Sequence, residues 1–464
     1  MSIRKDISLS SEGIKERKRK NNFPLAISNT IFLLLLIAGV SLFIFNARKI
    51  RRNIFLGKDS DRSDRKYERW KIMLLVAIGQ KKMFQRPIPA LLHLLVYVGF
   101  VLINIEVVEM IIDGSFGTHR FLSFLNFNGF HLYDFLIAFF EVLAFLVTFG
   151  CAVFLIRRNI LRLKRFAMKD LNGWPRTDAN LILCSEIILM SALFLMNAAD
   201  QTLQQMYSEH YFSAGNFPIS SFIAPLLSGM QENSLILIER SCWWLHIFGI
   251  LGFLNYIIIS KHFHIVLSFP NVFYSNLNPK GQLTNLQSVT NEVKAMLDPS
   301  FTPPPVNSDQ PMRFGAKDIF DLSWKQLLDA YTCTECGRCT SACPANQTGK
   351  LLSPRKIMMD TRDRLEEVGR NIDKNKKFAD DGKSLFGNYI SAEELWACTS
   401  CNACVQECPV NIDPLSIIID IRRFLVMEQS AAPQALNMTF TNIENNGAPW
   451  QYSPSDRLNW ANEN

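Results

Sequence analysis

The chain has 464 residues, of which 48% are hydrophobic and 20% are charged, and 35 are phenylalanine. This length allows two or three domains, and the composition predicts a membrane-embedded part joined to a polar part. The net charge of +7 arises largely from basic residues in particular loops, so it does not indicate a nucleic-acid partner.

Residues 1–65 predict a basic tail followed by a membrane anchor. The run Leu25–Phe45 carries no charge and is long enough to span a bilayer. It lacks a small-residue cleavage site, so we interpret it as an anchor and not as a removed signal peptide. Further along, Trp70–Phe84 mixes apolar and basic residues, which predicts an amphipathic helix along the membrane surface.

Residues 66–267 predict a membrane domain. Four more apolar runs are long enough to span a bilayer, and they are Pro87–Ile112, His131–Ile156, Asn180–Ala199 and Ser234–Ile259. We expect the last helix to continue to His264. The predicted fold class is a membrane all-α bundle of about five transmembrane helices, joined to an α-helical dicluster ferredoxin-like domain in the cytoplasm.

The basic residues indicate the orientation of the bundle. The segment 46–86 contains 13 Lys and Arg and the segment 157–176 contains seven, whereas residues 199–233 contain none. By the positive-inside rule, both basic segments and the C-terminal domain face the cytoplasm of a multi-pass protein in the cytoplasmic (inner) membrane. An odd number of spans places the N-terminal tail outside, so either this basic tail is translocated or the first run does not cross.

The C-terminal part predicts a linker, a small helical domain and a tail. Residues 268–316 have the proline-rich composition of a linker. Residues 317–430 contain eight of the 11 cysteines, with helical patterns at Ile319–Ala330 and Ser353–Val368. Residues 431–464 predict an extended polar tail.

Two cysteine runs, starting at Cys333 and Cys398, share the spacing C-x2-C-x2-C-x3-C-P. In bacterial ferredoxins with this spacing, the fourth cysteine of each run ligates the cluster of the other run. We therefore expect two [4Fe–4S] clusters, one held by Cys333, Cys336, Cys339 and Cys408, and the other by Cys398, Cys401, Cys404 and Cys343. The alternatives are structural zinc, which usually shows separated ligand pairs, and a disulfide framework, which needs an oxidising compartment.

Four of the seven histidines lie at or inside the predicted spans. On a continuous helix, His246 and His264 are 18 residues apart, which is five whole turns and a rise of about 27 Å, so they would serve two haems, one in each leaflet. His93, near the cytoplasmic start of its span, is the expected second ligand beside His264. His131 is the best candidate beside His246, and His119 is the next. The alternative is that these are interfacial or hydrogen-bonded core histidines.

Several segments resemble known families. Gly79–Met83 and Ser260–Phe273 resemble the two ends of the cytochrome b portion of membrane iron–sulfur oxidoreductases, whose spans are similar to the gamma subunit of respiratory nitrate reductase. Cys333–Asp360 and Ile390–Val426 resemble the dicluster domain of heterodisulfide-reductase-type proteins. The resemblance covers about residues 66–460.

This resemblance implies a quinone-linked oxidoreductase, namely a membrane electron-transfer subunit with two haems b (heme b), two [4Fe–4S] clusters and menaquinone or another quinone. Some such proteins pass electrons between electron-transfer flavoprotein and menaquinone. Many such chains continue into cysteine-rich CCG domains, whereas this one stops at Asn464. The resemblance then implies either a shorter relay or a partner whose catalytic site lies on another chain, a CCG-domain or flavoprotein subunit in the cytoplasm. We expect the second.

Two other functions fit the sequence. A membrane Fe–S assembly or metal-reducing protein for oxidase maturation also joins spans to a dicluster ferredoxin, but needs no haem. A structural anchor would use the clusters only to stiffen its domain. The sequence shows no Gly-rich dinucleotide fingerprint, so we expect no independent substrate site on this chain.

Overall fold

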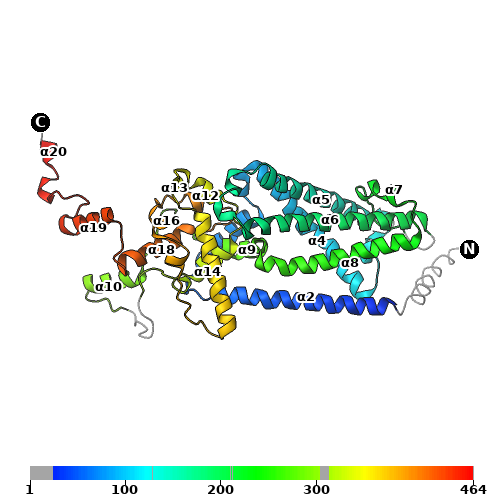
Figure 1. Ribbon diagram of the computed structural model, residues 1–464, viewed down its shortest axis with the longest axis horizontal. Coiled ribbons are helices and arrows are strands. Elements are labelled where there is room, and N and C mark those ends of the chain that lie inside the picture. Colours follow the sequence, from blue (N-terminus) through cyan, green and yellow to red (C-terminus); the bar gives the residue numbers. More distant parts are fainter. Residues whose placement is uncertain (1–23, 128, 209–210, 212, 304–312, 463–464) are drawn as a thin grey trace, which may run out of the picture. The chain divides into compact units, whose positions relative to one another are not determined.

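The computed structural model of the protein describes residues 24–127, 129–208, 211, 213–303 and 313–462 (Figure 1). The basic tail expected at the N-terminus lies outside these described residues, apart from its last position. The described chain divides into two compact units. Of the described residues, unit 1 contains those of 24–48 and 83–263, and unit 2 those of 49–82 and 264–462. The basic segment 49–82 thus belongs to the same unit as the cysteine-bearing part of the chain.

Five helices are long and apolar enough to cross a membrane, as the sequence predicts. They are α2 (Pro24–Ile54), α4 (Pro87–Phe116), α5 (Leu132–Leu155), α6 (Trp174–Met206) and α8 (Glu232–Tyr256). The bundle also contains the short helix α7 (Ala224–Leu227) and a hairpin of β1 (Asn126–Phe127) and β2 (Phe130–His131). The helices extend beyond most of the predicted apolar runs because flanking polar and aromatic residues continue the helical hydrogen bonding past the hydrocarbon-length segment.

Among the five described spanning helices, α6 is the most buried. Half of the residues in its most apolar 18-residue stretch are buried, compared with 6% in α2. It packs against α5 and α8, and α4 packs against α5. Two glycines permit close crossings, because a Cβ atom on Gly99 would overlap Val147 and one on Gly249 would overlap Leu189. Small residues at helix crossings let backbones approach closely, which is a main source of packing energy between helices in a membrane.

The prediction that the last spanning helix continues to His264 is wrong. α8 ends at Tyr256, and a single 3-10 turn leads to Ser260, whose φ and ψ of −110° and 151° are extended. A separate helix, α9 (His264–Phe273), begins after this break and belongs to unit 2. His246 and His264 are therefore not on one continuous helix, and the five-turn register between them does not apply.

Asp178 of α6 accounts for the break. Its carboxylate accepts hydrogen bonds from the Tyr256 hydroxyl and from the backbone N–H of Lys261 (3.2 Å). The ammonium group of Lys261 also donates to the carbonyl oxygen of Pro175 (2.6 Å) at the start of α6. These contacts hold the chain at the end of α8 against α6. In a continued α-helix, the backbone N–H of Lys261 would instead donate to the carbonyl oxygen four residues before it.

Unit 2 consists of helices and connecting loops. Its helices are α3 (Lys66–Met73), α9, α10 (Gln287–Leu297), α11 (Trp324–Thr332), α12 (Arg338–Ala342), α13 (Pro344–Gln347), α14 (Pro354–Asn375), α15 (Leu385–Asn388), α16 (Ala392–Trp396), α17 (Ala403–Glu407), α18 (Pro414–Met427), α19 (Gln434–Asn446) and α20 (Asn459–Asn462). α11 and α14 correspond to the two helical patterns predicted in the cysteine-bearing domain. Ser353 caps α14, accepting a hydrogen bond from the backbone N–H of Lys356.

The helix expected at Trp70–Phe84 is present as far as Ile78, as the end of α3 and a π-helical turn, and Trp70 and Leu74 on it are exposed. Its position along a membrane surface stays a prediction. Two other predicted segments of unit 2 differ from the structure. The expected linker contains α10 and the end of α9. The expected extended tail contains α19, which Gly447 ends with a left-handed φ of 62°.

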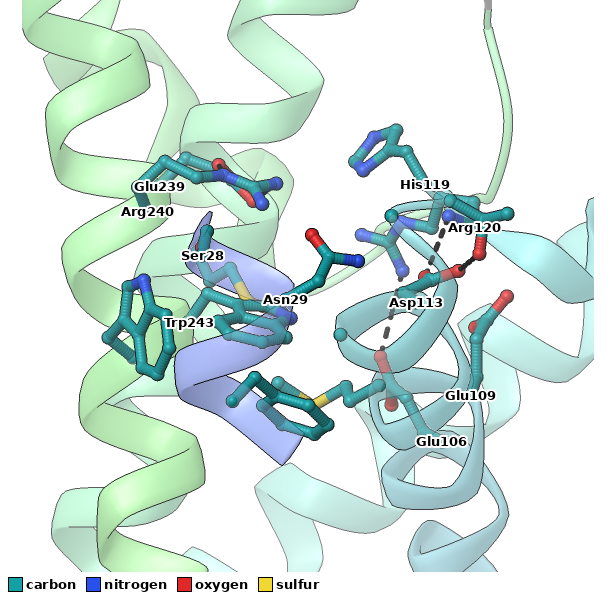
Figure 2. A pocket seen from close by; sticks show the side chains of 17 residues that line it. Ser28, Asn29, Glu106, Glu109, Asp113, His119, Arg120, Glu239, Arg240 and Trp243 are labelled. Carbon is teal, nitrogen blue, oxygen red and sulfur yellow. Dashed lines mark hydrogen bonds and ion pairs between the residues drawn. The ribbon is translucent and has the colours of Figure 1, made fainter. Parts of the chain in front are cut away.

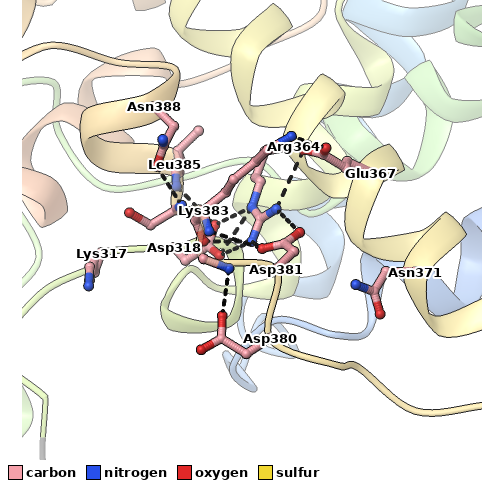
Figure 3. A network of polar contacts seen from close by, with 12 residues as sticks. Lys317, Asp318, Arg364, Glu367, Asn371, Asp380, Asp381, Lys383, Leu385 and Asn388 are labelled. Atoms are coloured by element: carbon pink, nitrogen blue, oxygen red, sulfur yellow. Dashed lines mark hydrogen bonds and ion pairs between the residues drawn. The ribbon is translucent and has the colours of Figure 1, made fainter. Parts of the chain in front are cut away.

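A buried arginine ties the region between the cysteine runs to the rest of unit 2. Figure 3 shows Arg364 of α14 among Asp318, Asp381 and Glu367. Its side chain is 0% exposed, and its Nη2 and Nη1 atoms lie 2.7 Å from Asp318 Oδ2 and 2.6 Å from Asp381 Oδ2. Because α14 also packs against α11 and α18, this region forms part of the core that positions the cysteines.

Candidate metal centres

The structure gathers the eight cysteines of the two runs into two groups of four. Quartet A consists of Cys333, Cys336, Cys339 and Cys408, which line one cavity. Quartet B consists of Cys343, Cys398, Cys401 and Cys404, which line a second cavity. Each quartet takes three cysteines from one run and the fourth from the other, the grouping expected from the spacing.

The two runs adopt the same local backbone. In the first, Glu335 and Gly337 have positive φ values of 55° and 72°, and in the second Ser400 and Asn402 have 56° and 59°. In each run, the two residues with positive φ turn the backbone between the first three cysteines. The second of them immediately precedes a five-residue helix, α12 or α17, that carries the third cysteine. α12 packs against α17, so each short helix delivers the cysteine at its end to the opposite quartet.

Backbone N–H groups point at cysteine sulfurs in both quartets. The N–H of Ser400 lies 3.4 Å from Cys398 Sγ, and that of Ile412 lies 3.3 Å from Cys408 Sγ. Hydrogen bonds of this kind stabilise negative charge on thiolate sulfur and raise the reduction potential of a bound cluster. The donors come from the loops that the left-handed residues shape and from the turn after Pro409.

The eight cysteines differ in their exposure to water. Cys333, Cys343 and Cys404 are buried, Cys401 is exposed, and the other four are half-buried. Burial raises the pKa of Cys333 and Cys408 to about 12. As free thiols these groups would therefore stay protonated at neutral pH, and a bound metal must displace their protons.

The two cavities differ in charge. The cavity of quartet A is lined by the basic residues Arg338 (3% exposed) and Arg355 (0% exposed) and by the acidic Glu335 (4% exposed). The residues beside the cysteines in the cavity of quartet B are uncharged, and outside that lining Arg422 Nη2 donates to the carbonyl oxygen of Cys398. The lining of quartet A thus carries one more positive than negative charge, and a positive lining favours the added electron.

Lys82 brings a further positive charge to quartet A. Its Nζ atom lies 3.2 Å from the carbonyl oxygen of Cys408 and 3.4 Å from that of Val405. In turn, Arg338 Nη1 donates to the carbonyl oxygen of Lys82 (3.2 Å). Sequence reasoning missed this residue because it is one of many basic residues in its loop, and no sequence signal marks it as a neighbour of a cysteine 326 positions away.

The zinc alternative differs from a cluster in the number of metal atoms that four thiols hold. A tetrahedral zinc ion holds its thiolates about 2.3 Å away, whereas a [4Fe–4S] cluster has one iron atom for each thiolate. The four cysteines of each quartet line one cavity.

The predicted haem ligands of unit 1 have different surroundings. His246 on α8 is 2% exposed, and its Nδ1 lies 3.1 Å from the carbonyl oxygen of Leu189. That contact fixes the ring and leaves Nε2 for another partner. His131 lies in β2 at the start of α5, where its side chain is 70% exposed and its Nδ1 is 3.0 Å from Asp134 Oδ2. His93 is a half-buried residue of α4.

The remaining predicted ligand, His264, is the first residue of α9 and belongs to unit 2. It is half-buried. The three cysteines outside the runs lie on spanning helices, and Cys151 and Cys242 are buried as small core residues. Cys184 is exposed on α6.

Comparison with known proteins assigns the cysteine region. The family model of the 4Fe–4S dicluster domain matches residues 332–412. The chain is 30% identical over 467 residues to the probable iron–sulfur-binding oxidoreductase FadF of Bacillus subtilis, which covers 94% of this chain and 61% of that protein. It is 26% identical over 459 residues to the EtfAB:quinone oxidoreductase of Syntrophomonas wolfei, which covers 93% of this chain and 59% of that protein.

A probable membrane-anchored ferredoxin of Chromohalobacter salexigens is 33% identical over 174 residues, which are 33% of this chain and 25% of that protein. Subunits C of heterodisulfide reductases match shorter stretches, as the resemblance of the cysteine region predicts. No solved structure matches the chain. The chain spans about three-fifths of the length of the two relatives that it matches along most of its own length.

These findings establish the general class of the protein. The chain contains a 4Fe–4S dicluster domain, and its relatives are iron–sulfur oxidoreductases and subunits of redox complexes. Five apolar helices and similarity to a membrane-anchored ferredoxin indicate a membrane protein. The chain thus joins a 4Fe–4S dicluster domain to five described helices that are able to cross a membrane.

Proposed function

We propose that the protein is a membrane electron-transfer subunit that carries electrons between the quinone pool and a cytoplasmic redox partner. The carrying observation is that one chain combines two cysteine quartets, each around its own cavity, with five helices able to cross a membrane. The name of one long relative, an EtfAB:quinone oxidoreductase, favours a quinone. The proposed partner is the predicted CCG-domain or flavoprotein subunit.

In this proposal each quartet ligates one [4Fe–4S] cluster, and the bound clusters supply one-electron relays. The protein's own groups around the cysteines would adjust the reduction potentials of the bound clusters. Burial of seven of the eight thiols, in part or in full, limits their contact with water, N–H groups stabilise the sulfurs, and Arg338, Arg355 and Lys82 bring positive charge to quartet A. Quartet B, with Cys401 exposed, is the site we propose to lie nearer the soluble partner.

Cysteine variants test the ligand sets in the purified full chain. Iron analysis and EPR of the reduced protein should show that Cys336→Ser and Cys401→Ser each perturb a different cluster. Cys343→Ser should perturb the same signal as Cys401→Ser, although it belongs to the run of Cys336. Cys184→Ser is the matched control outside both quartets and should change neither signal. If Cys343→Ser instead altered the signal of Cys336→Ser, the exchange of ligands between runs would be wrong.

The link to quinone is tested separately. Menadiol, a soluble naphthohydroquinone, should reduce the clusters of the wild-type protein reconstituted in lipid nanodiscs. Dithionite reduction serves as the control for intact clusters. Clusters that dithionite reduces and menadiol leaves oxidised would refute the quinone link.

We also propose a b-type haem in unit 1, with His246 as the ligand that the structure supports best. Its buried ring, oriented through Nδ1 by the carbonyl oxygen of Leu189, has the arrangement typical of a metal-ligating histidine. We keep the other haem ligands predicted from the sequence, namely His131 as the second ligand beside His246, and His93 as the second ligand beside His264. A bound haem would supply a further one-electron relay within the bundle.

Absorption spectra of the reduced protein test this part of the proposal. His246→Ala should remove the b-type absorption of its haem, whereas His262→Ala, a half-buried histidine outside the predicted ligand set, should retain it. Loss of about half of the haem in His93→Ala and in His264→Ala would support two haems. A wild-type protein that has clusters but no haem would refute this part and favour an assembly or metal-reducing role.

We propose that unit 2 faces the cytoplasm. The support is the sequence distribution of 13 Lys and Arg in residues 46–86 and seven in residues 157–176, at the ends of the spans expected to be inside. Fusing green fluorescent protein to the C-terminus should give fluorescent cells, because this reporter does not mature after export in the unfolded state. Activity of a C-terminal alkaline phosphatase fusion would contradict the orientation.

A further inference from the structure

A polar cavity lies at one end of the membrane bundle in unit 1. It is lined by the beginning of α2, the last turns of α4 with the loop that follows, and the first half of α8 (Figure 2). Phe32, Trp243 and Trp244 form its aromatic part, with the rings of Phe32 and Trp243 5.6 Å apart. Ionisable groups inside spanning helices are costly, so their concentration here calls for an explanation.

Most of the acidic side chains at the cavity have structural partners. Glu109 accepts hydrogen bonds from the backbone N–H of Leu122 (2.8 Å) and the hydroxyl of Tyr133 (3.1 Å). Asp113 stabilises the loop after α4 by accepting a hydrogen bond from the backbone N–H of Arg120 (2.9 Å). Glu239 is paired with its neighbour Arg240, whose Nη2 lies 2.6 Å from its Oε1.

Glu106 is the exception among these acids. Its side chain is 4% exposed, and its Oε1 atom is buried without a hydrogen-bond donor among the described residues. The nearest cation is Arg120, whose Nη1 is 3.7 Å away, beyond hydrogen-bonding distance. Arg120 instead directs Nη2 to Asp200 (2.9 Å) and Asn197 (2.8 Å). A buried carboxylate oxygen without a donor costs free energy, which a ligand with a donor group would recover.

We propose that this cavity binds the head group of a membrane hydroquinone, with one hydroxyl donating a hydrogen bond to Oε1 of Glu106. The ligand class rests on the proposed function. Three features select it: the site needs a donor, its aromatic side chains suit a flat ring, and it opens among helices that cross the membrane. Figure 2 shows the side chain of Asn29 on α2 among the residues that line the same cavity, where its carboxamide is a second polar group for a ligand.

The position of Glu106 also suits the chemistry of a hydroquinone. Its oxidation to the quinone breaks two O–H bonds and releases two protons and two electrons. The proton of the hydroxyl bound to Glu106 passes to that carboxylate, and the second leaves at the mouth of the cavity, where His119 is 41% exposed. The electrons leave singly to the one-electron carriers of the proposed function.

The experiment measures binding without relying on turnover. The probe is 2-heptyl-4-hydroxyquinoline N-oxide, a fluorescent quinol analogue whose emission is quenched on binding, titrated into the full chain in nanodiscs. Glu106→Leu removes the acceptor and should weaken binding about ten- to a hundredfold, the loss expected for a hydrogen bond to a charged group. Arg120 keeps Asp200 and Asn197 in this variant, so its charge stays paired.

Two further variants complete the design. Asn29→Trp fills the cavity from α2 and should also weaken binding, which keeps the proposal testable if Glu106→Leu does not fold. Glu186→Gln is the matched control, since Glu186 is a glutamate of α6 that is 8% exposed and does not line the cavity. Its affinity should equal that of the wild type.

Equal affinity in wild type, Glu106→Leu and Asn29→Trp would overturn the proposal, as would a folded wild-type protein that does not bind the probe. Failure of the folded wild type to bind the probe would mean that water is the hydrogen-bond donor to Oε1 of Glu106. Glu106-dependent binding without cluster reduction by menadiol would support the site and refute the proposed electron route, so the two failures are distinguishable.

Discussion

The charge of Lys82 should raise the reduction potential of the cluster in quartet A. Its ammonium group is 3.2 Å from the carbonyl oxygen of Cys408, which places it roughly 6 Å from a bound cluster. At an effective dielectric constant of about 20, a unit charge at about 6 Å contributes about 2.8 kcal/mol, or ~120 mV for one electron. Lys82 is only half-buried, so water screens part of this interaction and the expected effect is about 50–100 mV.

Lys82→Met should therefore lower the midpoint potential of the quartet A cluster, because the reduced cluster loses a neighbouring positive charge. EPR-monitored redox titration of the full chain measures both clusters in one sample. Lys82→Arg keeps the charge and should shift the potential little. Lys374→Met removes an exposed charge elsewhere in unit 2 and should leave both potentials unchanged.

The reasoning would be refuted if Lys82→Met left the potential of quartet A unchanged, or if it shifted quartet B equally. An equal shift of both clusters would indicate a general change in net charge, not the local contact at Cys408.

Two other predictions concern the stability and assembly of unit 2. Arg364→Met leaves the carboxylates around it without their shared cation and should destabilise the unit by about 3 kcal/mol, measured by chemical denaturation followed through loss of cluster absorption. Arg370→Met, on the same helix but 70% exposed, should change stability by less than about 0.5 kcal/mol, and equal effects would contradict the buried network. Burial raises the pKa of Cys333 and Cys408 to about 12, so cluster assembly on the apoprotein should release protons and become more favourable as pH rises. A pH indicator in weakly buffered solution measures this release, and its absence would show that the thiols ionise before iron binds.

The parts of the protein that follow local rules could be predicted from its sequence. A spanning helix needs about 20 apolar residues in a row, and each of the five runs meets that need within itself. The positions of the two cysteine quartets follow from a spacing of a few residues repeated twice. The helix over Ser353–Val368 is likewise marked by its capping serine and its own apolar periodicity.

The errors arose where a distant residue determines the local backbone. Ile257–Ile259 are apolar enough to continue α8, but Asp178, 83 positions before Lys261, captures the backbone N–H that a continued helix would use. The break removes the continuous helix from which His246 and His264 were predicted to serve two haems, five helical turns apart. The tail was expected to be extended because it is polar, yet polar residues also form a helix, as in Gln434–Asn446.

The sequence by itself determined the kinds of groups in the protein: eight cysteines in two cluster-binding runs and five helices able to enter a bilayer. Only the tertiary structure decided which groups are neighbours. It placed Lys82 beside Cys408, and it left one oxygen of Glu106 without a donor while satisfying the acids around it. The reason is physical, because spacing and hydropathy are summed along the chain, whereas charge interactions and hydrogen bonds depend on distances between residues far apart in it.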